Sequence, residues 1–299
     1  MERYHTFCEY YMYKTLSEHT FYVVDNNIPF IGRPLPENAK IISWKDIDWK
    51  IIDCGYAVSV NRFVDVLSKN KPCVFHIDQV PQEWDNPKKL NNIIGNKTPV
   101  VYWSKEEAEM WSVGEKIVRP HPIDSNLFKG YDPNKNMAIT IATRAISGWG
   151  PSLKGFNVLK IAYNELPIQV IAKGDRDFDN AKEILSEEEM IKTLQNHNVY
   201  FNSAWKIDRS PLEAMSVGMP VVAIRTKYNV YLDIFENNKS IFYANNTSQM
   251  IEITKMLLND KKLAKNTGNF ARETIKKHFN PELSKEGWNV AFNHAIKNI

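Results

Sequence analysis

The sequence has 299 residues, of which 43% are hydrophobic and 24% charged, as in globular proteins with room for two domains. No apolar run approaches the ~20 residues of a membrane span, and the N-terminus lacks a signal peptide's apolar segment. Cys8, Cys54 and Cys73 are odd in number and widely spaced, which argues against a disulfide framework and a zinc site. We therefore expect a cytoplasmic protein without a membrane span.

Charge is divided unevenly along the chain. The net charge is +3, but residues 1 to 130 hold 16 lysines and arginines against 17 acidic residues, a net of −1. The remainder holds 22 against 18, a net of +4, which favours an anionic ligand there. The first half lacks the strongly basic balance that nonspecific nucleic-acid binding usually needs, although a local basic patch is compatible with it.

The first half alternates strand and helix patterns. Residues 4–16 have helical spacing, and residues 20–24 predict a strand. A strand at 51–52, a helix near 61–67 and a strand at 72–76 follow. Because helices separate these strands, we expect parallel pairing.

A long polar stretch, residues 81–98, then predicts a loop that is either functional or disordered. Residues 100–103 predict a further strand, which Ser104 follows as a helix cap. The second half continues the alternation, with strands expected at 138–142, 168–174 and 198–203. Helices are expected at 248–258, 261–278 and 281–296, the last with Leu283, Trp288 and Phe292 as its apolar contacts.

The stretch SPLEAMSVGMPVVAI, residues 210–224, combines a helix start, a helix stop and a buried strand. Ser210 suits the N-cap, Pro211 the first helical position, and Glu213 the acidic position of a capping box. Gly218 suits the left-handed C-terminal position, and residues 221–224 read as a strand buried on both faces. This is the helix-to-strand step of an α/β domain.

Residues 212–223 also resemble the donor-binding motif of retaining GT-B glycosyltransferases of the family-4-like group, Leu-Glu-Ala-Met-Ala-x-Gly-x-Pro-Val-Val-Ala. The resemblance implies an α/β protein in which two Rossmann-like domains face each other across a cleft. It implies an acceptor-side domain at 1–135 and a donor domain at 136–279, with the hinge within 128–136, and a C-terminal helix, 280–299, that packs back on the first domain. Relatives open with a strand and a glycine-rich loop before the first helix, so we expect a shortened amino-terminal domain. By the same resemblance, residues 228–235 and 241–243 correspond to the last helix and strand of the donor domain.

The resemblance implies specific donor contacts. Glu213, with Ser210 beside it, binds the ribose hydroxyls of a nucleotide-sugar; the alternative is that Glu213 only closes its capping box. Arg144 and Lys154 grip the diphosphate, the alternative being two surface cations, and Gly174 belongs to a glycine loop near the donor. Fixed cations and N–H groups at a helix start can stabilise the departing nucleotide without a metal.

We expect no metal and no cofactor, with the nucleotide diphosphate-sugar as co-substrate. Residues 175–177, Asp-Arg-Asp, match the metal motif of the other glycosyltransferase fold, but two carboxylates at this spacing are common by chance. Relatives carry a sugar-contacting glutamate eight positions before the ribose-binding one, where this chain has Trp205. Asp208 or Lys206 can reach the sugar instead, so the sugar stays open. One strand that relatives place between 168–174 and 198–203 has no counterpart in the pattern.

Acceptor-side candidates come from the first half. His76 ends a predicted strand and either contacts the sugar or acceptor or merely closes the strand; Asp78 follows it. In the 81–98 stretch, Trp84 offers a stacking surface, and Lys88 and Lys89 offer phosphate contacts, although a solvated loop explains any one of them. The catalytic candidates are thus Arg144, Lys154 and His76.

The resemblance implies transfer of a hexosyl or pentosyl group from a nucleotide diphosphate-sugar to an acceptor hydroxyl, with retention and without metal. The acceptor we favour is a hydroxymethylated base in phage DNA, because the chain is compact and rich in Asn, Lys and Ile. A capsule, cell-wall or lipid-linked glycan is the alternative. A non-catalytic protein that binds sugar-nucleotides or nucleic acid also stays open, since fold alone does not give function.

Overall fold

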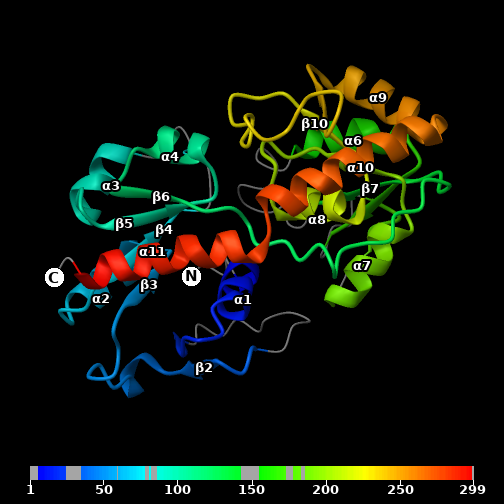
Figure 1. The fold of residues 1–299 in the computed structure, drawn as a ribbon. Helices are drawn as coiled ribbons and strands as arrows, with labels where there is room; N and C mark the ends of the chain where they lie inside the picture. The colour runs from blue at the N-terminus through cyan, green and yellow to red at the C-terminus, as the bar shows by residue number, and fades with distance from the viewer. Residues whose placement is uncertain are drawn as a thin grey trace. The chain divides into compact units, whose positions relative to one another are not determined.

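The computed structural model describes residues 6–24, 35–58, 60–77, 81, 86–142, 155–172, 178–182 and 186–297. The chain divides into two compact units: residues 1–122 with 281–299 form the first, and residues 123–280 form the second. Each unit is built on parallel strands with helices in the connections (Figure 1), which confirms the expected α/β class. Within these ranges no helix combines the length and the apolar character needed to cross a lipid bilayer.

The second unit begins at Ile123, upstream of the linker expected within 128–136. Phe128 is fully buried, and its carbonyl accepts hydrogen bonds from the Ser216 hydroxyl at 3.2 Å and from Arg272 Nη1 at 2.7 Å. These bonds hold the start of the expected linker inside the second unit, so it is not a free connection.

The main sheet of the first unit has four parallel strands in chain order, β3-β4-β5-β6. Parallel neighbours need a crossover, and helices supply it here. The strands are β3 (Gly55–Ala57), β4 (Cys73–His76), β5 (Pro99–Tyr102) and β6 (Glu115–Val118), and the helices are α2 (Val60–Leu67), α3 (Pro87–Ile94) and α4 (Lys105–Trp111). As expected, the Ser104 hydroxyl caps α4, accepting from Glu107 N at 3.1 Å.

Two expectations for the first unit are wrong. The strand expected at 51–52 starts at Gly55, whose N–H donates to Pro72 O at 2.8 Å, while Ile51 is 56% exposed. The stretch 81–98, expected as a loop, contains α3. Asn86 caps this helix by accepting from Lys89 N at 2.9 Å, so local capping organises the stretch.

Both faces of this sheet are covered. Helix α11 (Pro281–Lys297) packs on β4, β5 and β6, where Val74, Val101 and Trp288 belong to one buried cluster (Figure 1). The opposite face contributes Phe75 and Val100 to a second cluster with α2, α3 and α4. Because successive strand residues point to opposite faces, the doubly covered strands are continuous apolar runs.

The first unit also holds a separate pair of parallel strands. These are β1 (Phe21–Val24) and β2 (Ala39–Ile42), preceded by α1 (Thr6–Thr15) and followed by the 3₁₀ turn η1 (Trp44–Asp46). Helix α1 packs against α11. The strand expected at 20–24 is therefore confirmed, whereas β2 had no clear sequence signal.

The second unit has a five-stranded parallel sheet in the order β11-β10-β9-β7-β8. An isolated parallel bridge joins Ile171 to Lys182 on the far side of β8, at the place where the sequence pattern lacked a strand. The strands are β7 (Ala138–Ile141), β8 (Ile168–Ile171), β9 (Val199–Asn202), β10 (Val221–Ile224) and β11 (Phe242–Ala244). The helices are α6 (Phe156–Glu165), α7 (Glu187–Gln195), α8 (Arg209–Val217), α9 (Thr247–Asn259) and α10 (Lys261–His278).

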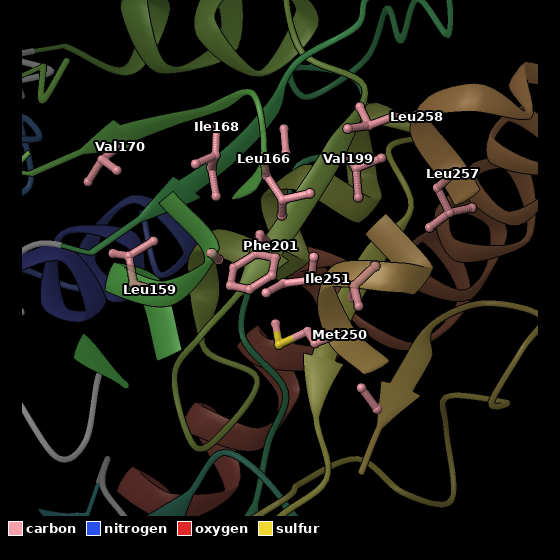
Figure 2. Close-up of a cluster of buried hydrophobic side chains, with 14 of the residues drawn as sticks. Leu159, Leu166, Ile168, Val170, Val199, Phe201, Met250, Ile251, Leu257 and Leu258 are labelled. Carbon is pink, nitrogen blue, oxygen red and sulfur yellow. The ribbon is translucent and has the colours of Figure 1, made fainter. Parts of the chain in front are cut away.

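The core of the second unit lies between the sheet and helices α6 and α9 (Figure 2). Phe201 of β9 and Met250 of α9 are fully buried there, together with Leu159 of α6. The labelled side chains are Leu159, Leu166, Ile168, Val170, Val199, Phe201, Met250, Ile251, Leu257 and Leu258. This packing fixes where α6 and the β-strands lie relative to one another.

The helix expected at 228–235 is wrong. This stretch forms turns, and Tyr231 has φ 62°, a left-handed conformation that a continuous helix excludes. The Tyr231 ring instead packs edge-on against Phe279 at 4.9 Å and is buried. Tertiary packing of one aromatic side chain therefore overrides the local pattern.

Candidate nucleotide-sugar site in the second unit

The strand order of the second unit marks a place for a ligand. The chain leaves β7 for β8 on one side, then returns to place β9 on the other side of β7. In open parallel sheets, ligands bind at the carboxyl ends of the strands where the order reverses in this way. The reversal lies between β7 and β9, so the connections that follow these two strands border the candidate site.

Helix α6 begins next to the strand reversal between β7 and β9. Its first helical residue follows Gly155, which has φ 64° and ψ 42° and makes no side-chain cap. A Cβ added to Gly155 would lie 1.9 Å from the carbonyl oxygen of Ser203, directly after β9. Only glycine allows both this left-handed backbone and this close approach. The N–H groups at the start of α6 therefore lie beside the carboxyl end of β9, a place suited to an anion.

Helix α8 begins beside the same strand end, but not as the sequence predicted. Its N-cap is Asp208 and its first residue is Arg209, so Ser210 is inside the helix and is not the cap. Glu213 is then too far along α8 to close a capping box. The expected stop is confirmed, because Gly218 adopts the left-handed conformation with φ 103°.

Glu213 makes a different contact. Its Oε1 accepts from Arg209 Nε at 2.8 Å, one helical turn earlier, and the two side chains are only 4% and 11% exposed. Arg209 was not among the site residues predicted from the sequence, although a spacing of four residues between an arginine and a glutamate is a recognisable helix signal. A buried carboxylate that accepts from a guanidinium in this way is held in one direction.

Tyr200 of β9 connects these elements. Its phenol hydrogen bonds to the backbone of Ile141, at the end of β7, and to the side chain of Ser210. Complete burial raises the pKa of Tyr200, and the negative charges of Glu213 and Asp208 raise it further. The phenol is therefore neutral and acts as a hydrogen-bonded brace between β7, β9 and α8.

The connection between β9 and α8 carries Trp205. Its ring is stacked on Tyr228, with centroids 5.1 Å apart and planes within 2°, and both residues are half-buried. The Trp205 carbonyl accepts from Thr226 Oγ1 at 2.8 Å, which ties this connection to the one after β10. Lys206 and Asp208 pair with each other at 3.5 Å. An aromatic pair therefore stands on the carboxyl side of β9 and β10, where relatives are expected to have the glutamate.

Several predicted donor residues lie outside the described residues. Arg144 and Lys154 fall in the connection between β7 and α6, and Gly174 follows β8. The connection from β7 to α6, which contains Arg144 and Lys154, still borders the strand reversal in chain order. It starts at the end of β7 and ends at Gly155. Within the ranges that are described, no group of three or more His, Cys, Asp or Glu side chains could hold a metal ion.

His76, the first-unit candidate, ends β4 and is 1% exposed. Its Nδ1 is hydrogen-bonded to the Tyr56 hydroxyl at 2.7 Å, and its ring packs edge-on against Trp103 and Trp288. Arg119, which the sequence analysis did not single out, lies between the two indoles, with its guanidinium carbon 3.9 and 3.8 Å from the ring centroids. His76 thus belongs to a buried aromatic cluster.

Of the remaining acceptor-side candidates, two lie within the described residues and two lie outside them. Lys88 and Lys89 are exposed in the first turn of α3, whose first turn contains no acidic residue. Two ammonium groups beside the N–H groups of a helix start form a positively charged surface. Asp78 and Trp84 lie outside the described residues.

No protein-family model matches the sequence, and no curated protein matches it either. Solved structures do resemble the fold. HepE from Anabaena, solved with UDP-glucose, has a TM-score of 0.64 at 15% identity, covering 80% of this chain and 78% of its own. A glycosyltransferase from Rickettsia africae has a TM-score of 0.68 at 14% identity over 98% of this chain and 94% of its own. This chain has the GT-B fold.

A third GT-B structure supports the same assignment over most of the chain. Sucrose-phosphate synthase from Thermosynechococcus elongatus has a TM-score of 0.67 at 12% identity, covering 93% of this chain and 89% of its own. The prediction of a GT-B protein with two Rossmann-like domains is thereby confirmed. At these identities the likeness establishes the fold, and the chemistry has to be argued from the site.

Proposed function

We propose that this protein is a glycosyltransferase that moves a sugar from a nucleotide diphosphate-sugar to an acceptor hydroxyl. The observation that carries the proposal is the convergence at one strand reversal of a buried, fixed carboxylate and two helix starts. The motif around Glu213 and the GT-B fold are consistent with it, and HepE of the same fold was solved with UDP-glucose.

In this proposal, one set of residues holds the ribose of the donor and another set holds its diphosphate. Glu213 accepts hydrogen bonds from the ribose hydroxyls while Arg209 keeps the carboxylate oriented. The proposed role of Ser210 is a contact to the ribose, and that of Gly174 is a place in a loop near the donor. Arg144 and Lys154 would grip the diphosphate beside the N–H groups at the start of α6.

The chemistry requires positive charge at the diphosphate. When the bond between sugar and phosphate breaks, negative charge develops on the departing nucleotide, and preorganised cations and N–H groups stabilise it. Arg144, Lys154 and the start of α6 supply these groups without requiring a metal. Transfer with retention and a hexosyl or pentosyl donor follow from the resemblance of the motif.

Donor hydrolysis tests this function directly. The protein is mixed with UDP-, GDP-, ADP- and dTDP-sugars, and released nucleotide is measured with and without a chelator. We expect release from at least one donor, unaffected by chelation. Binding of nucleotide without release would favour a non-catalytic sugar-nucleotide protein, and no binding at all would remove the donor site from the proposal.

For the acceptor we favour a hydroxymethylated base in DNA. Such a base must be flipped from the duplex, while the phosphates are held by cations. The exposed Lys88 and Lys89 at the start of α3 suit phosphate contacts, and Trp84 a base or sugar face. The roles proposed for His76, which ends β4, and for Asp78 are contacts with the acceptor. A phage-encoded enzyme in the host cytoplasm would meet this substrate.

A capsule, cell-wall or lipid-linked glycan is the second candidate. The net charge of −1 over residues 1 to 130 favours it, because duplex DNA attracts a strongly basic surface. An acceptor screen with hydroxymethylated DNA, oligosaccharides and lipid-linked sugars separates the two. Sugar transferred only to glycans would rule out the DNA acceptor while leaving the glycosyl transfer intact.

A further inference from the structure

The connection between β9 and α8 is held in one conformation by polar side chains. Asn202, at the end of β9, donates through Nδ2 to the carbonyl oxygens of Ala204 at 3.2 Å and Lys206 at 3.1 Å. The carbonyl of Trp205, between them, accepts from Thr226 Oγ1 at 2.8 Å. Three consecutive carbonyl groups are therefore fixed, and with them the direction in which the Trp205 side chain leaves the backbone.

The Trp205 ring has one aromatic partner among the described residues. It stacks on Tyr228 with the planes within 2°, and Lys227 Nζ lies 4.9 Å from the Tyr228 ring centroid. Tyr228 N–H donates at 3.1 Å to Thr226 Oγ1, the same hydroxyl that holds the Trp205 carbonyl. The indole is half-buried, so part of its surface is accessible. It is thus a supported apolar platform that is partly open to a ligand.

The platform lies close to the start of α6. Ser203 precedes Trp205 by two residues, and its carbonyl oxygen is the atom nearest to a Cβ placed on Gly155, the residue before α6. Because two residues span at most about 7 Å, the Trp205 backbone is within about that distance of the Ser203 backbone. The N–H groups at the start of α6 suit the diphosphate of the donor. A ring at this place therefore borders a group that is attached to the diphosphate.

Of the two groups attached to the diphosphate, the sugar matches Trp205 better than the nucleoside does. The proposed function assigns the ribose to Glu213, inside α8. This helix joins the carboxyl end of β9 to the start of β10, which is parallel to β9, so it leads away from the strand ends. Glu213 is four residues past Arg209, which is about 6 Å along the helix, whereas Trp205 precedes the helix. The two residues thus lie at different depths.

The charged groups beside the platform are engaged with one another. Asp208 pairs with Lys206 at 3.5 Å, and Glu213 pairs with Arg209 at 2.8 Å. An indole has a single N–H donor and no acceptor, whereas its ring offers a broad apolar face. A sugar on this face is therefore held through its C–H surface, and not by hydrogen bonds from its hydroxyl groups to a carboxylate.

The two kinds of contact differ in what they reject. A site that hydrogen-bonds a hydroxyl group rejects an analogue without it by about 10⁴- to 10⁵-fold, because a buried polar group is left unpaired. An apolar pocket accepts the analogue, and rejects a substrate that merely adds a hydroxyl group by only about 100-fold. A wall made of an indole therefore favours the sugar that has fewer hydroxyl groups.

We propose that Trp205 binds the donor sugar by stacking, and that the preferred donors are deoxyhexoses, which have a hydrogen atom in place of a hydroxyl group where the sugar meets the indole. This inference rests on the proposed sugar-transfer function and names the donor class for the same site. It makes Trp205 the residue that determines specificity, while Tyr228 and Thr226 hold the indole in place.

The test compares donors that differ by one hydroxyl group on the same nucleotide. Nucleotide diphosphate-glucose with uridine, guanosine, adenosine or thymidine as the nucleoside is paired with its 3-, 4- and 6-deoxy forms. Released nucleotide gives kcat/KM for each donor, and calorimetric titration gives the affinity for each donor and for the free nucleotide diphosphate.

Three variants are measured beside the wild type, with the melting temperature as the control for folding. Trp205→Phe keeps an aromatic ring, and Trp205→Gln introduces an amide that hydrogen-bonds a hydroxyl group. Trp49→Gln is the matched control, because Trp49 is also half-buried and packs against another ring, that of Trp44, at 5.0 Å, but lies in the first unit.

We expect kcat/KM for at least one deoxy donor to exceed that for its glucose parent by about 10- to 100-fold in the wild type, in Trp205→Phe and in Trp49→Gln. Trp205→Gln should lose or reverse this preference, with an affinity for the free nucleotide within about threefold of wild type. The inference is overturned if the glucose parent is preferred over all three deoxy forms, or if Trp205→Gln keeps the wild-type preference. Weaker binding of the free nucleotide by Trp205→Gln would place the indole on the nucleobase and also overturn it.

Failure of the inference differs from failure of the proposed function. In each of the overturning results above, nucleotide is still released or bound, so a donor site remains. If no donor is hydrolysed and none binds, the proposed function fails, and the inference about the donor sugar falls with it.

Discussion

Glu213 accepts a hydrogen bond from Arg209 at 2.8 Å, and both side chains are almost completely buried at the start of α8. An ion pair removed from water in this way stabilises little by itself, but removing one partner leaves a buried charge. The pair also keeps the carboxylate in one direction, which a ribose ligand requires. Stability and ligand binding can therefore be separated by substitution.

We predict that Glu213→Gln destabilises the protein by about 3 kcal/mol, because Arg209 is left without its counter-charge. The double variant Arg209→Met, Glu213→Leu should recover most of this loss, since neither charge remains. Neither variant should bind nucleotide diphosphate. Denaturant unfolding beside calorimetric titration measures both effects. Normal nucleotide affinity in the double variant would show that Glu213 has only a structural role.

Arg144→Ala and Lys154→Ala should each abolish most sugar transfer while the protein stays folded. Loss of one charge-assisted contact to the diphosphate should raise the barrier by about 2 to 4 kcal/mol, roughly 30- to 900-fold in rate. Turnover is measured from released nucleotide at saturating donor, with melting temperature as the control for folding. Turnover within about threefold of wild type in both variants would contradict the assignment of these residues to the diphosphate.

Gly155→Ala should weaken nucleotide binding, whereas a comparable glycine substitution elsewhere in the unit should not. The added methyl group would lie 1.9 Å from Ser203 O, so the start of α6 must move away from β9. Gly218→Ala is the matched control: it has a similar left-handed strain, but its nearest contact is Tyr131 Cβ at 3.2 Å. We expect Gly218→Ala to lose about 1 to 2 kcal/mol of stability from its left-handed backbone, Gly155→Ala to lose more because a backbone contact must also open, and only Gly155→Ala to lose nucleotide affinity beyond its loss of stability. Equal affinities would place the nucleotide elsewhere.

Trp205→Glu should change the preference among donor sugars without changing the affinity for the nucleotide alone. The resemblance of residues 212–223 to the donor motif implies that Trp205 takes the place of a sugar-contacting glutamate, and its ring is stacked on Tyr228. Tyr228→Leu serves as the control, because it removes the stack without adding a carboxylate. The measurement is kcat/KM for several sugars on one nucleotide. A Trp205→Glu profile identical to that of Tyr228→Leu would mean that position 205 does not contact the sugar.

The double variant Lys88→Glu, Lys89→Glu should reduce transfer to hydroxymethylated DNA at least tenfold and leave donor hydrolysis unchanged. The two side chains are exposed, so the fold should tolerate the change. Lys276→Glu, Lys277→Glu gives the same change in net charge on α10 and should have little effect. If only glycans accept sugar, and the lysine variants transfer as well as wild type, α3 has no part in acceptor binding.

Much of the fold was predictable because its signals are local. The strand at 221–224, the helix stop at Gly218 and helix 261–278 each follow from an apolar run, a left-handed glycine or helical spacing within a few residues. The cap at Ser104 is equally local, since its acceptor and donor are three residues apart. The GT-B fold followed from such elements and from one motif.

Other features required the tertiary structure, because they join residues that are distant in the sequence. Arg119 is held by Trp103, Trp288 and the Ser284 hydroxyl, up to 169 positions away, so its burial has no local signal. In the same way, the closeness of Gly155 to Ser203 is visible only once β9 is placed. Even Glu213, found from its motif, was given the wrong local partner, because the N-cap of α8 is Asp208 and not Ser210. The sequence by itself determined which segments are helices and strands wherever patterns within a few residues are strong enough to set the local structure. Contacts between distant residues decided where helices begin, which charges pair, and that Trp205 is tied to the connection after β10.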